Sequence, residues 1–205
     1  MQFIEFKRSL RDFIIFNLSD IRKIQTDFDL RRLSEWQDKN YIKMIRRGHY
    51  IFADLEINES VLFLIANKIY YPSYVSLEMA LSYYSLIPEG VYSITSVASE
   101  KTNRFKNDLG EFVYRHIKPE LMFGYEIINY KNHNFKMAEV EKAVLDYFYL
   151  NPRLKTDDDF SELRFNEEEF KNKADKKKLE RYLNEFNNKS LSERFNKFLK
   201  FINYA

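Results

Sequence analysis

Residues 41–52 read YIKMIRRGHYIF, and this stretch constrains the fold more than any other part of the chain. It contains two short runs of apolar, β-branched and aromatic residues, separated by a basic doublet and by one of only 4 glycines. Ile42 and Met44 alternate with Lys43 and Ile45, and this period of two residues is typical of a β-strand. Gly48 can adopt the positive φ that a tight turn requires. The stretch therefore predicts a β-hairpin with Arg46 and Arg47 at its tip.

Three helices are predicted before this hairpin. The first has apolar residues every three or four positions, at Phe3, Phe6, Leu10 and Phe13. Asn17 and Asp29 are residues of the type that caps the start of a helix, and each precedes a further amphipathic segment. The residues expected to face inward are Leu18, Ile21 and Ile24 in the second helix, and Leu30, Leu33 and Trp36 or Gln37 in the third.

The order helix, short helix, helix, hairpin is that of a winged helix-turn-helix, whose second helix of the pair enters the DNA major groove. Under this interpretation, part of the third helix lies near base edges, and the hairpin lies along the phosphate backbone. The residues expected near base edges are Arg31, Arg32, Ser34 and Lys39. The residues expected to hold the backbone are Lys43, Arg46, Arg47 and His49. The alternative is that both groups form ordinary solvated surfaces.

Composition restricts the chemistry that the chain can perform. It has no cysteine, so disulfides and thiolate metal sites are excluded, and its 3 histidines are too scattered to predict a metal cluster. Its net charge of +2 says little about partners, although the excess of basic residues lies in the N-terminal part. No signal peptide or membrane span is expected, because charged residues interrupt every apolar run. We therefore expect a cytoplasmic protein without a membrane partner.

The remainder of the chain reads as mixed helix and strand followed by helices. Strands are predicted at 91–97, 111–117 and 125–130, and helices within 76–87 and at 137–150. The predicted fold class is α/β (α+β): an N-terminal winged helix-turn-helix at 1–56, then a second domain at 57–205. This second domain is mixed α/β to about residue 154 and helical over 155–205. Ser76 is expected to cap its helix, and Glu141 and Lys142 are expected to make surface or interdomain contacts.

Catalytic motifs are not evident. The sequence has no phosphate-binding glycine loop, no nucleophile elbow and no paired-histidine zinc motif. The best enzymatic alternative is a metal-dependent nuclease that uses the acidic run at 157–159 with Glu169 and Lys171. Carboxylates in a chain with 31% charged residues more often cap helices or face solvent. We therefore expect a protein without catalytic residues, cofactor or metal.

Three blocks of the second part resemble a known family. They are PSYVSLEMALSYYSLIPEGVYSITSV, FKNDLGEFVYRHIKPELMFGY and MAEVEKAVLDYFYL, at residues 72–97, 105–125 and 137–150. In this order they resemble the AbiEi family of antitoxins, predicted transcriptional regulators of viral defence systems. The resemblance covers roughly residues 15–165, with ELRFN as a weaker match.

The resemblance implies a bacterial antitoxin in which a winged helix-turn-helix precedes an antitoxin domain. Members of the family repress their own operon by binding promoter repeats. They also neutralise a co-encoded toxin of the nucleotidyltransferase fold, often without a stable complex. The expected partners are therefore double-stranded promoter DNA and such a toxin. An alternative is an antitoxin that acts only through protein interaction, its winged helix having lost DNA binding.

Overall fold

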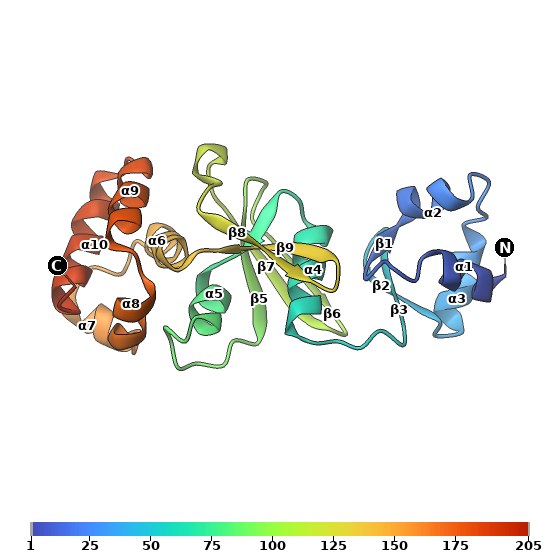
Figure 1. The fold of residues 1–205 in the computed structure, drawn as a ribbon, viewed down its shortest axis with the longest axis horizontal. Coiled ribbons are helices and arrows are strands. Elements are labelled where there is room, and N and C mark those ends of the chain that lie inside the picture. Colours follow the sequence, from blue (N-terminus) through green and yellow to red (C-terminus); the bar gives the residue numbers. More distant parts are fainter. Residues whose placement is uncertain (1, 205) are drawn as a thin grey trace.

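The structure is a computed structural model that describes residues 2–204. It is a mixed α/β fold with two sheets and a helical C-terminal region, which confirms the predicted α/β class and the predicted C-terminal helices. Three parts follow one another along the long axis of the molecule (Figure 1). We call residues 3–52 the N-terminal body, residues 59–150 the central body and residues 157–201 the C-terminal helices.

The N-terminal body consists of three helices and a small sheet. Its elements are α1 (Phe3–Ser9), β1 (Phe16–Asn17), α2 (Leu18–Ile24), α3 (Arg31–Asp38), β2 (Ile42–Arg46) and β3 (His49–Phe52). The strands are antiparallel in the order β1-β3-β2. Helix and strand residues share one core of mostly aromatic side chains, in which the rings of Phe6 and Trp36 lie 4.5 Å apart. This core is separate from the larger one in the rest of the chain.

Local sequence signals predict most of this body. Asn17 caps α2, and its side chain accepts a hydrogen bond from the backbone N–H of Asp20 at 3.1 Å. Gly48 has a φ of +81° in the hairpin turn. Three details were wrong. The N-cap of α3 is Leu30 rather than Asp29, and the side chain of Leu30 is 48% exposed and does not face inward. Ile24, predicted to face inward in the second helix, is 40% exposed. Helix α1 ends at Ser9, so that Phe13 lies outside it.

The central body is built on a six-stranded sheet. Its strands are β4 (Ser73–Val75), β5 (Ser93–Ala98), β6 (Asn103–Asn107), β7 (Gly110–His116), β8 (Tyr125–Tyr130) and β9 (His133–Ala138). Their order is β6-β7-β5-β4-β9-β8, with parallel pairs β5/β7 and β4/β9 and antiparallel pairs elsewhere. The helices of this body are α4 (Glu59–Ile69), α5 (Leu77–Tyr83) and α6 (Val140–Leu150), with the short 3-10 helix η1 (Pro119–Leu121).

The predicted strands correspond to β5, β7 and β8, and the predicted helices to α5 and α6. The sequence interpretation missed β4, β6 and β9. It also began the last helix of this body too early, because Met137 and Ala138 belong to β9. β4 has only three residues, and polar residues make up four of the five positions of β6 and three of the six of β9, so none of them has a clear local strand pattern.

Four helices form the C-terminal region. They are α7 (Asp157–Glu162), α8 (Glu167–Lys173), α9 (Lys176–Glu185) and α10 (Lys189–Phe201). Phe195 and Phe198 of α10 are fully buried and pack on Phe148 of α6, with ring centroids 5.2 and 4.7 Å from it. The C-terminal helices therefore share the core of the central body.

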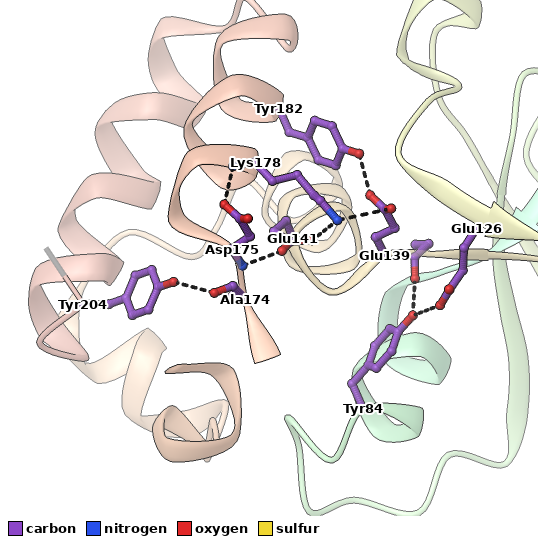
Figure 2. A network of polar contacts seen from close by, with 10 residues as sticks. Tyr84, Glu126, Glu139, Glu141, Ala174, Asp175, Lys178, Tyr182 and Tyr204 are labelled. Carbon is purple, nitrogen blue, oxygen red and sulfur yellow. Dashed lines mark hydrogen bonds and ion pairs between the residues drawn. The ribbon is translucent and has the colours of Figure 1, made fainter. Parts of the chain in front are cut away.

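Polar contacts also join these helices to the central body (Figure 2). Lys178 of α9 forms an ion pair with Glu139 at 3.3 Å, and the hydroxyl of Tyr182 donates to the same carboxylate. Glu141 is 2% exposed and accepts a hydrogen bond from the backbone N–H of Asp175 at 2.7 Å. Glu141 was expected at a surface or between domains, but it is buried within the predicted second domain, where it joins α6 to the start of α9.

An ion pair lies buried inside the central body. Lys142 and Asp146, one turn apart on α6, are both 0% exposed and contact each other directly. The second carboxylate oxygen of Asp146 accepts hydrogen bonds from the hydroxyls of Tyr74 and Ser76, each at 2.9 Å. Burial raises the pKa of Asp146 and lowers that of Lys142. The prediction that Lys142 lies at a surface or between domains was wrong, because its ammonium group is enclosed by Asp146 and by aromatic rings.

Over residues 2–204, the structure contains no helix that combines the length and the apolar character needed to cross a membrane.

Candidate nucleic-acid interface

Helix α3 presents a mixed charged face to solvent. Leu33 and Trp36 are buried on its inner side, so the residues between them point outward. Four of the residues predicted to contact bases lie here: Arg31, Ser34 and Lys39 are exposed, and Arg32 is half-buried. Glu35 and Asp38 share the exposed side. The structure therefore groups the predicted base-contacting residues on one helix, with two carboxylates among them.

Arg31 forms an ion pair with Asp29. Its Nε lies 3.2 Å from Oδ1 of Asp29, and the same oxygen accepts a hydrogen bond from the backbone N–H of Arg31 at 3.0 Å. These two hydrogen bonds lower the pKa of Asp29, which stays ionised and partly neutralises the arginine. Across residues 2–204, Arg32 and Lys39 have no such ion pair and are the cations of α3 available to a ligand.

The hairpin sheet has two different faces. Ile42, Phe52 and Phe16 pack into the N-terminal core. Ile45 and Ile51 belong instead to the core of the central body. The sheet is thus sandwiched between its own helices and the central body, as the view in Figure 1 also shows. At the turn of the hairpin, Arg47 is exposed.

Arg46 is the last residue of β2, directly beside the turn, and its side chain is engaged within the protein. A bulge between Met44 and Arg46 shifts the register of β2 against β3. The guanidinium of Arg46 lies over the ring of Phe105, 4.4 Å from its centroid, and donates a hydrogen bond to the backbone carbonyl of Ile69. Arginine stacks well on aromatic rings, so this residue fastens the hairpin to the central body.

Lys43 and His49 lie back from the tip, and both are half-buried. His49 borders a cavity of about 240 Å³ between β1, β3 and α4, together with Asp20, Lys68 and His133. Its buried Nδ1 has no hydrogen-bond partner among the described residues. Burial lowers the pKa of His49, and the positive charge of Arg46 acts in the same direction, whereas the backbone of Arg47 and the charge of Asp20 oppose the shift. His49 is thus a half-buried residue in the wall of this cavity.

The structure should lose stability as the pH falls through about 6.5, the pKa of an unperturbed histidine, because the unfolded chain then takes up a proton that folded His49 resists. We expect the melting temperature of the wild type to fall between neutral and mildly acidic pH. The His49→Gln variant should lose less over the same interval, since glutamine does not titrate. Equal losses in the two proteins would contradict this role of His49.

The residues of the nuclease alternative serve helix structure. Thr156 caps α7, and Asp159 accepts hydrogen bonds from the backbone of residues 155 and 156. Lys171 pairs with Glu167 at 3.4 Å, and Glu169 pairs with Lys173 at 2.6 Å, one turn apart along α8. Within residues 2–204, no three histidine or acidic side chains gather in a group that could hold a metal ion.

Sequence reasoning missed two features of this region. One is the contact of Arg46 with the central body. The other is the cavity that half-buried His49 lines. The signal for the first was the apolar face of the hairpin formed by Ile45 and Ile51, which pack with the core of the central body. A comparison with protein-family models and with curated proteins finds no match for the sequence.

Proposed function

We propose that this protein is a DNA-binding regulator whose helix α3 enters the major groove while the turn at Arg47 lies along the phosphate backbone. The observation that carries the proposal is the topology of the N-terminal body. Its elements follow the order α1-β1-α2-α3-β2-β3, and its sheet has the order β1-β3-β2. This is the arrangement expected of a winged helix-turn-helix, with α3 as the recognition helix.

The distribution of cations supports the same proposal. Arg32 lies on α3, Lys39 follows its last residue, and Arg47 lies at the hairpin turn. Two separate elements therefore offer positive charge that one duplex can meet. Because Arg31 and Arg46 are engaged within the protein, one expected base contact and one expected phosphate contact are less available than the sequence suggested.

We further propose that the protein is a non-catalytic antitoxin that represses its own operon and neutralises a co-encoded nucleotidyltransferase toxin. This part rests on the resemblance of residues 72–97, 105–125 and 137–150 to the AbiEi antitoxins. Such an antitoxin acts in the cytoplasm, where both its promoter and its toxin are found. Co-expression with the product of the neighbouring gene tests it: rescue of growth is expected, and unrelieved toxicity would contradict it.

A second candidate is an antitoxin without DNA binding. The observation in its favour is the presence of Glu35 and Asp38 on the exposed side of α3, where they repel phosphates. The two candidates differ in the binding of the purified protein to its own upstream DNA across a salt series, with an unrelated duplex of equal length as control. Tight and salt-sensitive binding that prefers the promoter supports the regulator. Equally weak binding to both duplexes supports the second candidate.

Arg47→Ala should weaken binding to all duplexes alike and lower the slope of log affinity against log salt by about 1, because one phosphate contact is lost. Arg46→Ala is the matched control, one residue away in the same hairpin. It should leave the slope unchanged, since the guanidinium of Arg46 lies against Phe105. Equal effects of the two substitutions on the slope would refute this assignment of the turn.

Arg32→Ala should reduce the preference for the protein's own promoter by roughly 1–3 kcal/mol, the contribution of an arginine that reads a base edge. Arg31→Ala should have a smaller effect, because its guanidinium is paired with Asp29. Both variants are measured against the promoter and the unrelated duplex at one salt concentration. If Arg32→Ala lost affinity equally for both duplexes, Arg32 would contact the phosphate backbone of the DNA and not a base edge.

A further inference from the structure

Strand β8 forms a free edge of the central sheet. It is the last strand in the order β6-β7-β5-β4-β9-β8, so it pairs with β9 on one side only. The opposite edge, β6, lies against the N-terminal body, where Asn107 donates a hydrogen bond to the backbone carbonyl of Ile45 at 3.0 Å. A free edge strand exposes a row of backbone donors and acceptors that another strand can bind.

The outward-pointing backbone groups of β8 can be identified. The turn to β9 consists of Lys131 and Asn132, both with positive φ, so the flanking pair Tyr130 and His133 is hydrogen-bonded. Hydrogen-bonded and non-hydrogen-bonded pairs then alternate along the hairpin. The pair Ile127 and Lys136 is therefore not hydrogen-bonded.

Asn67 provides independent support for this register. Its side chain accepts a hydrogen bond from the backbone N–H of Lys136 at 2.6 Å and donates one to the carbonyl of the same residue at 3.4 Å. Both backbone groups of Lys136 thus point away from β8. By the same alternation, the N–H and C=O groups of Tyr125, Ile127 and Asn129 point away from β9. Within residues 2–204 these outward groups have no hydrogen-bond partner.

Two exposed apolar side chains lie beside this edge. Ile127 is 64% exposed and Tyr71 is 73% exposed, and both line a shallow cavity of about 230 Å³ beside the edge. The one carboxylate in the strand, Glu126, accepts a hydrogen bond from Tyr84 of α5, as Figure 2 shows. Edge strands that must remain unpaired are usually protected by charges, prolines or bulges, and no such residue lies in the outward row of β8.

We propose that two copies of this chain pair through β8, antiparallel about a two-fold axis at Ile127. Ile127 then lies opposite Ile127 of the second copy, and Tyr125 lies opposite Asn129 in both directions. Each of these three pairs exchanges two backbone hydrogen bonds, so every outward group of β8 finds a partner. The two six-stranded sheets join into one continuous sheet.

A second copy fits this edge for three reasons. The outward residues are symmetric about Ile127, so one register uses all of them. No like charges lie opposite each other, because Glu126 faces Ile128 of the second copy. Pairing also leaves only β6 edges, which lie against the N-terminal bodies, so the assembly closes as a dimer. The inference goes beyond the proposed function and holds whether or not the protein binds DNA.

Sedimentation of the full chain over a wide concentration range tests the proposal. The wild type should move from the mass of one chain, 25.0 kDa, towards twice that mass as concentration rises. Ile127→Lys and Ile127→Glu should each raise the dimer dissociation constant on the order of 100-fold, since each puts like charges opposite each other and removes apolar contact. The control Ile4→Lys, at an isoleucine that is 72% exposed on α1, should dimerise like the wild type.

An equimolar mixture of the Ile127→Lys and Ile127→Glu chains should restore the dimer, because opposite charges then meet at the axis. This recovery also shows that both variants are folded. A wild type that stays monomeric at all concentrations would overturn the proposal. So would dimerisation of Ile127→Lys alone, dissociation of the Ile4→Lys variant, or a mixture that remains monomeric.

Discussion

Replacing Asp146 with alanine is expected to lower the free energy of unfolding by about 3–5 kcal/mol, because it leaves a buried ammonium group without its opposite charge. Lys142 is 0% exposed, and its remaining polar neighbour is the hydroxyl of Tyr74 at 2.8 Å. The substitution also leaves the hydroxyl of Ser76 without its acceptor. Chemical denaturation followed by far-UV circular dichroism measures the loss.

Two controls separate burial from ion pairing itself. The double variant Lys142→Met/Asp146→Leu removes both charges and should regain most of the lost stability, since apolar residues of similar volume often replace a buried pair without loss. The pair Glu167 and Lys171 has the same spacing on α8 but is exposed, so Glu167→Ala should change stability by about 0.5 kcal/mol or less. A loss of that small size in Asp146→Ala would contradict the buried network.

The network around Lys142 and Asp146 could not be predicted from the sequence. Ser76 occupies the N-cap position of α5, as predicted, but it makes no side-chain cap, and its hydroxyl donates to Asp146 instead. Helix caps, turns and amphipathic faces depend on residues a few positions apart, and such local signals predicted the cap at Asn17, the turn at Gly48 and the helices α5 and α6. The burial of Lys142 depends on Tyr74, Phe123 and Phe186, which lie far away in sequence and carry no local signal.

In the candidate interface, too, local features could be predicted from the sequence, and features that depend on distant residues could not. The hairpin and the position of Arg47 follow from alternation and from Gly48, both local. The orientation of Arg46 follows from a bulge in β2 and from Phe105 in a strand that the sequence analysis did not identify. An arginine next to a turn is therefore predictable as a residue of the hairpin, whereas the direction of its side chain depends on the body against which the hairpin packs.

Phe6→Ala should unfold the N-terminal body while the central body stays folded. Phe6 is 1% exposed, and its ring packs on Phe16, Phe28, Trp36 and Phe52. Truncating a buried phenylalanine costs about 3–5 kcal/mol. A core in a body of this size seldom contributes more than about 3–5 kcal/mol of net stability, so the loss removes nearly all of it. Under the proposed function, DNA binding should disappear with it.

Trp36 makes this prediction measurable, because it is the only tryptophan of the chain and lies in the N-terminal core. In Phe6→Ala its emission should be red-shifted without denaturant, while the circular dichroism transition of the rest of the chain keeps its midpoint. Phe63→Ala, at a residue that is also 1% exposed but belongs to the central core, should lower that midpoint and leave the emission unchanged in water. If both variants shifted both signals together, the contacts of Ile45, Ile51 and Arg46 with the central body would couple the two cores into one cooperative unit. The hairpin and α3 could then move relative to the central body only by unfolding.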